Sequence, residues 1–250
     1  MRAFRSLGIA IVVVAGIALH GVANATVFNA VTDFSLTTNT AANTWSYWTS
    51  SSTNVSTYPA TIALAPFLFN TTCGFGTSCW DSTAGTTNLL LQNVTGSDGP
   101  FPNGIARNDQ LSFYTRSGLT LLRFLAPSAG SYTVKGFFEG SATNPEVTQE
   151  LIAVNDNVAS PQLNITKAEA FGAINPFSFT VALGAGGTVD FLVAGITTTP
   201  DLNSLTTGFA ATITSGATSV PELGTWAMMV TGFALVGARL RRRRAQPASV

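Results

Sequence analysis

Residues 130–139 read Gly-Ser-Tyr-Thr-Val-Lys-Gly-Phe-Phe-Glu, and apolar and polar side chains largely alternate along them. In an extended chain, successive side chains point to opposite faces of a sheet. One face therefore carries Tyr132, Val134, Gly136 and Phe138, and the other carries Ser131, Thr133, Lys135 and Phe137. This alternation predicts a β-strand that covers a core with one of its faces.

The same pattern recurs along the chain, most clearly at Phe177, Phe179, Val181 and Leu183. Turn signals stand at 129–130 and 184–187. The other strand-like segments are Val27 to Leu36, Thr44 to Thr49, Ile62 to Phe69, Leu89 to Val94, Gln110 to Tyr114, Leu119 to Phe124, Gln149 to Val154, Thr188 to Ala194 and Thr207 to Thr214. No segment has the long 3.6-residue apolar period of an amphipathic helix. About ten short strands with turns between them predict an all-β antiparallel β-sandwich, or jelly roll.

The formal charge of zero is an average over three unlike parts of the 250-residue chain. Residues 1–25 carry +2, residues 26–220 carry −6 and residues 221–250 carry +4. Charged residues make up 10% of the chain, well below the ~25% of ordinary soluble domains. Because the body is acidic and has no basic stripe, nucleic acid is not expected as a partner.

The N-terminus has the pattern of a secretory signal peptide. Arg2 and Arg5 precede an apolar run over residues 7–19, and Ala23 and Ala25 provide small residues for cleavage after Ala25. The alternative is an uncleaved membrane anchor. The run of about 13 residues is shorter than the ~20 that a spanning helix needs, so we expect export and cleavage.

The C-terminal end combines a break, an apolar segment and a basic cluster. Pro221 ends the preceding strand-like segment, because proline cannot donate to a β-ladder. Residues 226–238 are apolar and uncharged, and a run of arginines follows them. Arginine clusters resist translocation, so this end is expected on the cytoplasmic side of the inner membrane, with the body outside.

This tail resembles the PEP-CTERM sorting signal, in the variant with Trp-Ala after the Pro-Glu element. The matching residues are Pro221, Glu222, Trp226, Ala227, Met228, Met229, Gly232, Phe233, Gly237 and the arginines Arg241, Arg242, Arg243 and Arg244. Leu223 stands where the family usually has a second proline, and residues 245–250 follow the arginines. The resemblance implies that exosortase, a membrane protease, recognises the tail, cuts near Pro-Glu and releases or transfers the body. A plain C-terminal membrane anchor is the alternative.

A series of segments in the body carries a second resemblance. They are 33–35, 45–47, 122–134, 154–156, 177–181 and 188–193. In this order they are similar to the galactose-binding-like jelly rolls that are common among PEP-CTERM proteins. These motifs are structural and imply a fold rather than a ligand. The expected organisation is a signal peptide at 1–25, a β-sandwich at 26–218, the sorting signal at 219–244 and a short tail at 245–250.

The catalytic inventory of the body is small. His20 lies in the signal peptide, so the mature body has no histidine for a Ser-His-Asp or Cys-His site or for a His-ligated metal. Four carboxylates stand near predicted strand ends: Asp33, Asp81, Asp156 and Asp190. They suit a glycosidase pair or a calcium site, or they form turns. The family resemblance implies a structural calcium ion, but no D-x-D-x-D-G loop occurs, and we expect neither a catalytic residue nor a metal ligand.

Cys73 and Cys79 enclose a small glycine-rich loop. An even pair in an exported protein favours a disulfide. The alternative is a redox-active pair, but five intervening residues do not make a C-x-x-C motif.

Four aromatic residues gather in the first third of the chain: Trp45, Tyr47, Trp48 and Trp80. Exposed rings of this kind would stack on sugars and bind glycan, whereas buried ones would fill the core. We therefore expect an exported, non-enzymatic protein of the cell surface or exopolysaccharide matrix that binds glycan or adheres. The alternatives are a carboxylate-based glycan hydrolase or lyase, and a structural matrix protein without a ligand.

Overall fold

The alternating stretch at 130–139 forms β11 (Gly130–Gly140), whose inner face buries Tyr132, Val134 and Phe138. The structure is a computed structural model. It describes residues 25–35, 38–55, 58, 65–66, 68–70, 77–81, 88–101, 104–115, 118–143, 147–196, 206–216 and 230–235. Ala25–Gly216 form one compact unit.

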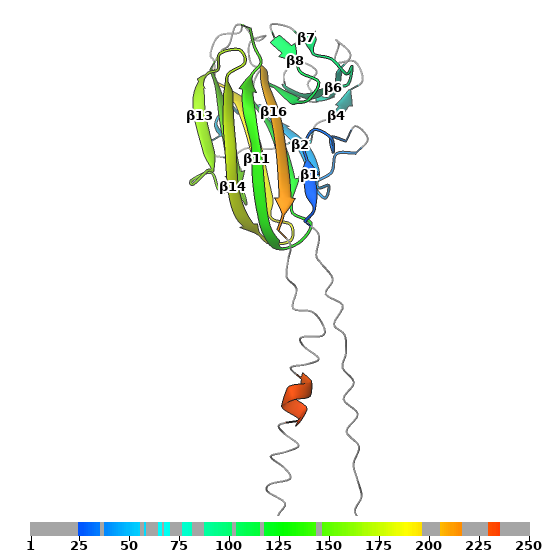
Figure 1. The fold of residues 1–250 in the computed structure, drawn as a ribbon. Coiled ribbons are helices and arrows are strands. Elements are labelled where there is room, and N and C mark those ends of the chain that lie inside the picture. Colours follow the sequence, from blue (N-terminus) through cyan, green and yellow to red (C-terminus); the bar gives the residue numbers. More distant parts are fainter. Residues whose placement is uncertain are drawn as a thin grey trace, which may run out of the picture. The chain divides into compact units, whose positions relative to one another are not determined.

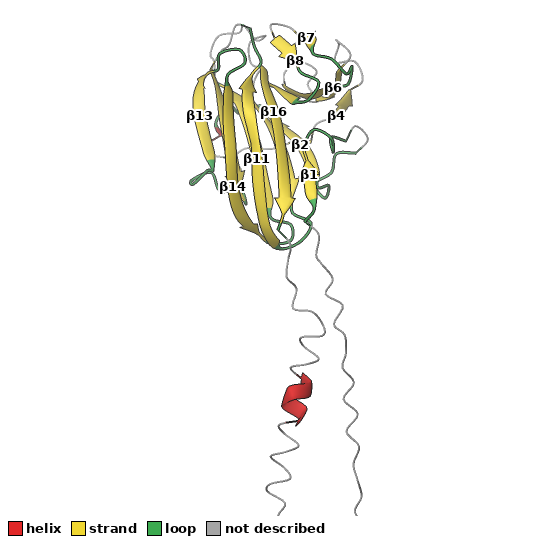
Figure 2. Cartoon of the chain, in the orientation of Figure 1, coloured by secondary structure: helices red, strands yellow, loops and turns green. Residues whose placement is uncertain are grey.

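Two antiparallel sheets make up this unit (Figures 1 and 2). The first, sheet A, has the order β14 (Ile174–Leu183), β11, β16 (Thr206–Ser215), β9 (Leu111–Thr115), β6 (Asn88–Asn93), β5 (Thr77–Asp81) and β4 (Leu68–Asn70), with β1 (Val27–Asn29) also beside β16. Sheet B has the order β13 (Leu163–Ala168), β12 (Val147–Val154), β15 (Thr188–Gly195), β10 (Leu119–Leu125), β2 (Trp45–Ser50) and β3 (Ala65–Pro66). A separate hairpin pairs β7 (Gly99–Phe101) with β8 (Gly104–Ala106).

Strands that follow one another along the chain largely alternate between the two sheets. From β9 to β12 each strand lies in the opposite sheet from the one before, and β14, β15 and β16 alternate again. Most neighbours within a sheet are consequently distant in sequence, as in a jelly roll. The predicted all-β antiparallel sandwich is confirmed.

An aromatic core fills the space between the sheets. Phe209 lies 4.9 Å from Phe191 and 5.1 Å from Phe138, measured between ring centroids. Gly136 leaves room for this packing, because a Cβ there would stand 2.6 Å from the ring of Phe177. The predicted inward alternation along both β11 and β14 is therefore the source of the core.

The outer face of sheet B carries a second apolar cluster. Leu121 of β10 and Leu192 of β15 are register partners and fully buried on that face. The chain after β2 returns over them and packs Val55 and Tyr58 against the sheet. The domain is therefore thicker than two bare sheets on this side.

The predicted strand from Val27 to Leu36 is wrong beyond its first residues. Strand β1 ends at Asn29, whose Oδ1 accepts hydrogen bonds from the backbone N–H groups of Val31 and Thr32. An asparagine side chain that binds the backbone ahead of it replaces the strand with a turn. The prediction also missed β5, β7, β8 and β13.

The two sorting segments fall almost entirely outside the described residues. Of the signal peptide, only Ala25 is described, and of the C-terminal tail, only residues 230–235, which are helical. In the described part of the chain, no helix is long and apolar enough to cross a membrane. Of the residues matched to the sorting signal, only Gly232 and Phe233 lie in it, and Ala23, the Pro-Glu element, Trp226 and the arginines lie outside, so export and sorting stay predictions.

Candidate functional site

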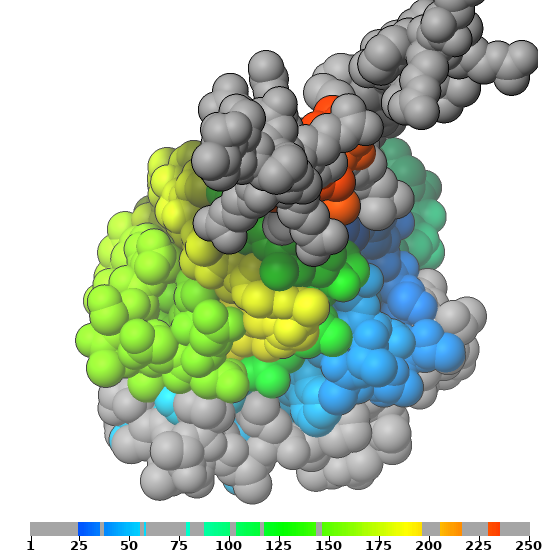
Figure 3. Space-filling model, turned by 90° about the horizontal axis from the view of Figure 1, so that it is seen from below, coloured from blue at the N-terminus to red at the C-terminus, as the bar shows by residue number. Residues whose placement is uncertain are grey.

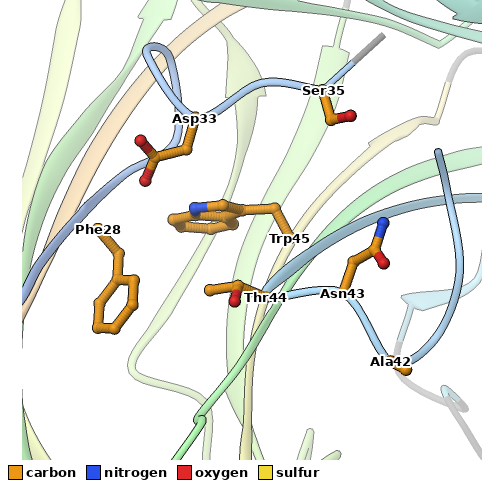
Figure 4. A pocket seen from close by; sticks show the side chains of 7 residues that line it. All are labelled: Phe28, Asp33, Ser35, Ala42, Asn43, Thr44 and Trp45. Carbon is orange, nitrogen blue, oxygen red and sulfur yellow. The ribbon is translucent and has the colours of Figure 1, made fainter. Parts of the chain in front are cut away.

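One stretch of chain lines an open pocket of about 480 Å³. Its lining residues all come from positions 28–45, and they are Phe28, Asp33, Ser35, Ala42, Asn43, Thr44 and Trp45 (Figure 4). Figure 3 shows the blue residues of this early part of the chain as a continuous region of the surface. The pocket therefore combines two aromatic rings with a carboxylate, an amide and hydroxyl groups.

A short turn after β1 places Asp33 at the pocket. The Asp33 backbone N–H donates to the Asn29 carbonyl at 2.9 Å, and the Asn29 N–H donates back to Asp33 Oδ2 at 2.8 Å. Thr32 donates to the other oxygen, Oδ1, at 3.3 Å. Since a carboxylate has about four lone-pair positions, Asp33 keeps capacity to accept hydrogen bonds from a ligand.

Two core aromatics fix the wall that contains Ser35. The Ser35 N–H donates to the hydroxyl of Tyr47 at 3.0 Å, and the Ser35 carbonyl accepts from Trp80 Nε1 at 2.8 Å. The rings of Tyr47 and Trp80 stack at 5.5 Å. Burial raises the pKa of Tyr47 to about 12, with the Ser35 hydrogen bond opposing and the charge of Asp33 adding to the rise. These contacts make the pocket wall a rigid extension of the core.

Trp45 forms the floor of the pocket. Its ring lies edge-on to Phe124 at 5.3 Å, and only 4% of the residue is exposed. Its indole Nε1 is buried and has no hydrogen-bond partner among the described residues. A buried donor without an acceptor is costly, and such a group in a native structure calls for an explanation.

Some of the remaining polar groups of the pocket already make hydrogen bonds within the protein. Asn43 is committed within its own loop, because Nδ2 donates to the Thr38 carbonyl at 3.0 Å and Oδ1 accepts from Thr40 at 2.9 Å. The backbone carbonyl of Thr44 accepts from Leu125 at 2.8 Å. Among the lining residues, Asp33 therefore keeps acceptor capacity, and the buried Trp45 indole N–H is a donor without a partner among the described residues.

The predicted aromatic platform is not an exposed surface. Trp45, Tyr47 and Trp80 belong to the main core and are 4%, 0% and 4% exposed, so their ring faces cannot stack on a sugar. Burial follows from the strand alternation, which turns Trp45 and Tyr47 inward. Trp48 points to the opposite face, where it is half-buried and its Nε1 donates to Ser46 at 2.9 Å. Trp45, Tyr47 and Trp80 therefore fill the core, which was the alternative interpretation. Of these three residues, only Trp45 lines the pocket.

The predicted cysteine pair is described on one side only. Cys79 is fully buried in β5, and Cys73 lies outside the described residues. The disulfide between them stays a prediction.

Two of the four singled-out carboxylates meet on the outer face of sheet B. Asp190 and Asp156 both form ion pairs with Arg123, and the hydroxyl of Tyr58 donates to each of them at 3.1 Å. Asp33 lies at the pocket instead, and Asp81 is the last residue of β5. Within the described ranges, no three His, Cys, Asp or Glu side chains are arranged to hold a metal ion.

A second hollow of about 550 Å³ lies on the outer face of sheet A. Lys135, Phe137 and Thr212 of β11 and β16 line it, together with Asn29 of β1 and the turn residue Asp109. Asn29 of this hollow and Phe28 of the first pocket are adjacent in β1, so the short strand separates the two.

Comparisons with known proteins return distant structures only. No family model and no curated protein matches the chain. A family 35 carbohydrate binding module from Clostridium thermocellum is 16% identical over 57% of this chain and 90% of its own, with a TM-score of 0.27. CBM35 from Paenibacillus barcinonensis is 15% identical over 61% of this chain and 100% of its own, with a TM-score of 0.27. The GH26-CBM35 β-(1,4)-mannanase from Podospora anserina is 11% identical over 62% of this chain and 27% of its own, with a TM-score of 0.28. Because the sequence identities and TM-scores are this low, the function of this chain has to be inferred from its own residues.

Proposed function

We propose that the protein is an exported, non-enzymatic surface or matrix protein whose β-sandwich binds a saccharide in the pocket beside Trp45. The observation that carries the proposal is the indole N–H of Trp45, a residue of the pocket lining, because this N–H is buried and has no partner among the described residues. A ligand hydroxyl would supply the missing acceptor. The cost of the orphaned donor would then be recovered on binding.

The chemistry of the pocket suits a hydroxyl-rich ligand. A sugar hydroxyl both donates and accepts, so it can accept from the Trp45 N–H and donate to Asp33. The ring of Phe28 is only partly buried and offers an apolar surface to the C–H groups of a sugar. A few polar groups on an apolar floor are typical of small-molecule sites.

Among the described residues that line this pocket, Asp33 is the single carboxylate. Glycoside hydrolysis in most families uses a pair of carboxylates on either side of the scissile bond. This favours binding over hydrolysis in the proposal. The export signal and the resemblance to the PEP-CTERM tail support sorting by exosortase, with transient insertion in the inner membrane and exopolysaccharide as the ligand source.

The proposal is tested with the mature protein on an array of purified bacterial exopolysaccharides and their oligosaccharides. We expect binding that Asp33→Asn weakens and that Asp98→Asn leaves unchanged, because Asp98 is an exposed carboxylate that does not line the pocket. Silence across the array, or equal binding by both variants, would remove the pocket as a saccharide site.

A further inference from the structure

Four polar side chains meet inside the sandwich where edge strands of the two sheets come together. They are Lys167 of β13, Asn175 of β14, Glu150 of β12 and Glu169 in the turn after β13. Glu150, Glu169 and Asn175 are 1%, 5% and 8% exposed, whereas the Lys167 side chain is 50% exposed. Three members therefore lie in the interior, and the lysine reaches them from the rim.

The amine and the carboxamide are in direct contact. Lys167 Nζ donates to Asn175 Oδ1 at 3.1 Å and lies 3.0 Å from Glu169 Oε1. Asn175 Nδ2 donates to the same Glu169 oxygen at 2.6 Å and to Glu150 Oε2 at 2.9 Å. One carboxylate oxygen thus contacts both nitrogens, and a second acid contacts the carboxamide nitrogen.

The backbone holds this cluster in place. Asn175 pairs in register with Phe138 of β11, which is fully buried in the core. The Gly140 N–H donates to the Ala173 carbonyl at 2.9 Å, and the Gly172 N–H donates to the Gly140 carbonyl at 2.7 Å. A Cβ on Gly140 would stand 2.8 Å from the Cβ of Glu169, so the glycine allows this turn to approach the end of β11.

We propose that Lys167 and Asn175 form an intramolecular isopeptide bond. The Lys167 Nζ attacks Asn175 Cγ, an Nζ–Cγ amide bond forms, and the Cγ–Nδ2 bond breaks. The lysine starts as an ammonium group and gives up two protons. Both pass to the departing nitrogen, which leaves as ammonium. The balance requires no oxidant, metal or cofactor.

The two glutamates fit the proton transfers of this reaction. Glu169 Oε1 lies between the attacking and the leaving nitrogen, so it can take a proton from Nζ and deliver it to Nδ2. Burial raises the pKa of Glu150 to about 7, so this acid keeps a proton to far higher pH than an exposed glutamate. Its Oε2 can therefore protonate the leaving nitrogen, and its Oε1 has no other partner among the described residues.

A competing loss of ammonia at Asn175 is blocked by the sequence. Asparagine ordinarily loses ammonia when the next backbone N–H attacks its side chain and closes a five-membered ring. The next residue is Pro176, which has no N–H. An ammonia-sized mass loss at this asparagine therefore reports on the lysine.

The test is mass spectrometry of the purified full-length or processed chain. We expect the wild-type mass to be lower, by one ammonia, than the mass calculated for its residues and termini. Trypsin should leave the bond after Lys167 uncut, so that Lys167 and Asn175 stay in one continuous peptide, residues 136–239 in the full-length chain, which is itself lighter by one ammonia. Lys167→Arg keeps the charge but cannot form the amide, so it should show the full calculated mass. Lys135→Arg is the matched control, because Lys135 lies on the outer face of sheet A, and it should retain the loss.

Glu150→Gln and Glu169→Gln should each leave part or all of the chain unlinked, with the full mass. The proposal is overturned if wild-type protein has the full calculated mass and amine-reactive reagents label Lys167. Because the wild-type measurement decides this alone, the outcome does not depend on whether a variant folds.

Discussion

Arg123 and Asp190 are register partners on the outer face of sheet B, with Arg123 Nε 2.7 Å from Asp190 Oδ1. Arg123 Nη2 also contacts Asp190 Oδ2 at 2.9 Å, so the pair is bidentate. Asp190 is fully buried. Burial raises the pKa of Asp190 to about 6, while the hydrogen bond and the charge of Arg123 act against that rise. The Tyr58 hydroxyl contacts Asp190 Oδ2 and also Asp156 Oδ1.

Arg123→Met should strongly destabilise the fold. The substitution leaves the fully buried Asp190 without its counter-charge and its bidentate hydrogen-bond donor, and breaking a buried pair in this way costs about 3–5 kcal/mol. Urea denaturation measures the loss. Asp98→Asn is the control, because the Asp98–Arg107 pair is exposed and should cost under about 1 kcal/mol. Similar losses of stability in the two variants would mean that the buried Arg123–Asp190 pair contributes no more to stability than an exposed ion pair.

Gly136→Ala should destabilise the core by about 1–3 kcal/mol, the usual cost of overpacking. The added Cβ would stand 2.2 Å from the Ala210 carbonyl oxygen and 2.6 Å from the Phe177 ring. Gly184→Ala is the matched control, because nothing lies within 4 Å of a Cβ there. Thermal denaturation of both variants checks the prediction, and an unchanged melting temperature for Gly136→Ala would contradict the packing described for β11 and β14.

The strands with an alternating pattern, above all β11 and β14, could be predicted from that pattern. The strand predicted at 130–139 appears as β11, and the one predicted from Phe177 appears as the second half of β14. Strand β13 was missed because an edge strand buries little, and Asn164, Thr166 and Lys167 give it a polar sequence. Local patterns detect burial, and a strand with little burial leaves no such pattern.

The candidate site was harder to predict because its residues depend on three-dimensional proximity. Trp45 was singled out either as an exposed ring that stacks on a sugar or as a ring that fills the core, and neither interpretation included its buried N–H beside a pocket. Phe28 carried no functional signal at all, although it lines the same pocket. The contact between Lys167 and Asn175 joins different sheets, and their separation of eight residues matches no known motif.

Trp45→Phe should weaken saccharide binding by about 3- to 10-fold, the equivalent of one neutral hydrogen bond. The substitution removes the indole N–H and keeps an aromatic ring in the core. Trp48→Phe is the control, because its Nε1 already donates to Ser46 at 2.9 Å on another face. Titration calorimetry with a ligand from the array measures both. Equal affinities for Trp45→Phe and wild type would exclude the indole as a ligand donor.

Replacing Pro221 and Glu222 with Ala should retain the full-length protein in the inner membrane, because exosortase would lose the element it recognises. Fractionation and immunoblotting of the producing bacterium measure this. The control replaces Pro247 in the short tail with Ala, which should leave processing unchanged. Normal release of the Pro221 and Glu222 variant would show that the tail acts as something other than an exosortase signal.

The buried acid at Glu150 should make the protein less stable as the pH rises towards neutral. Its pKa is about 7 in the folded chain against 4.5 for an ordinary glutamate, so the folded state binds the proton more tightly than the unfolded state. The free energy of unfolding must then fall as the pH rises from about 4.5 to about 7, by an amount on the order of 2 kcal/mol from this group. Glu150→Gln removes the titration, so the difference in stability between wild type and variant should change in the variant's favour across this range. Urea denaturation at several pH values measures that difference, and a difference that stays constant from pH 4.5 to 7 would show that Glu150 ionises normally inside the sandwich.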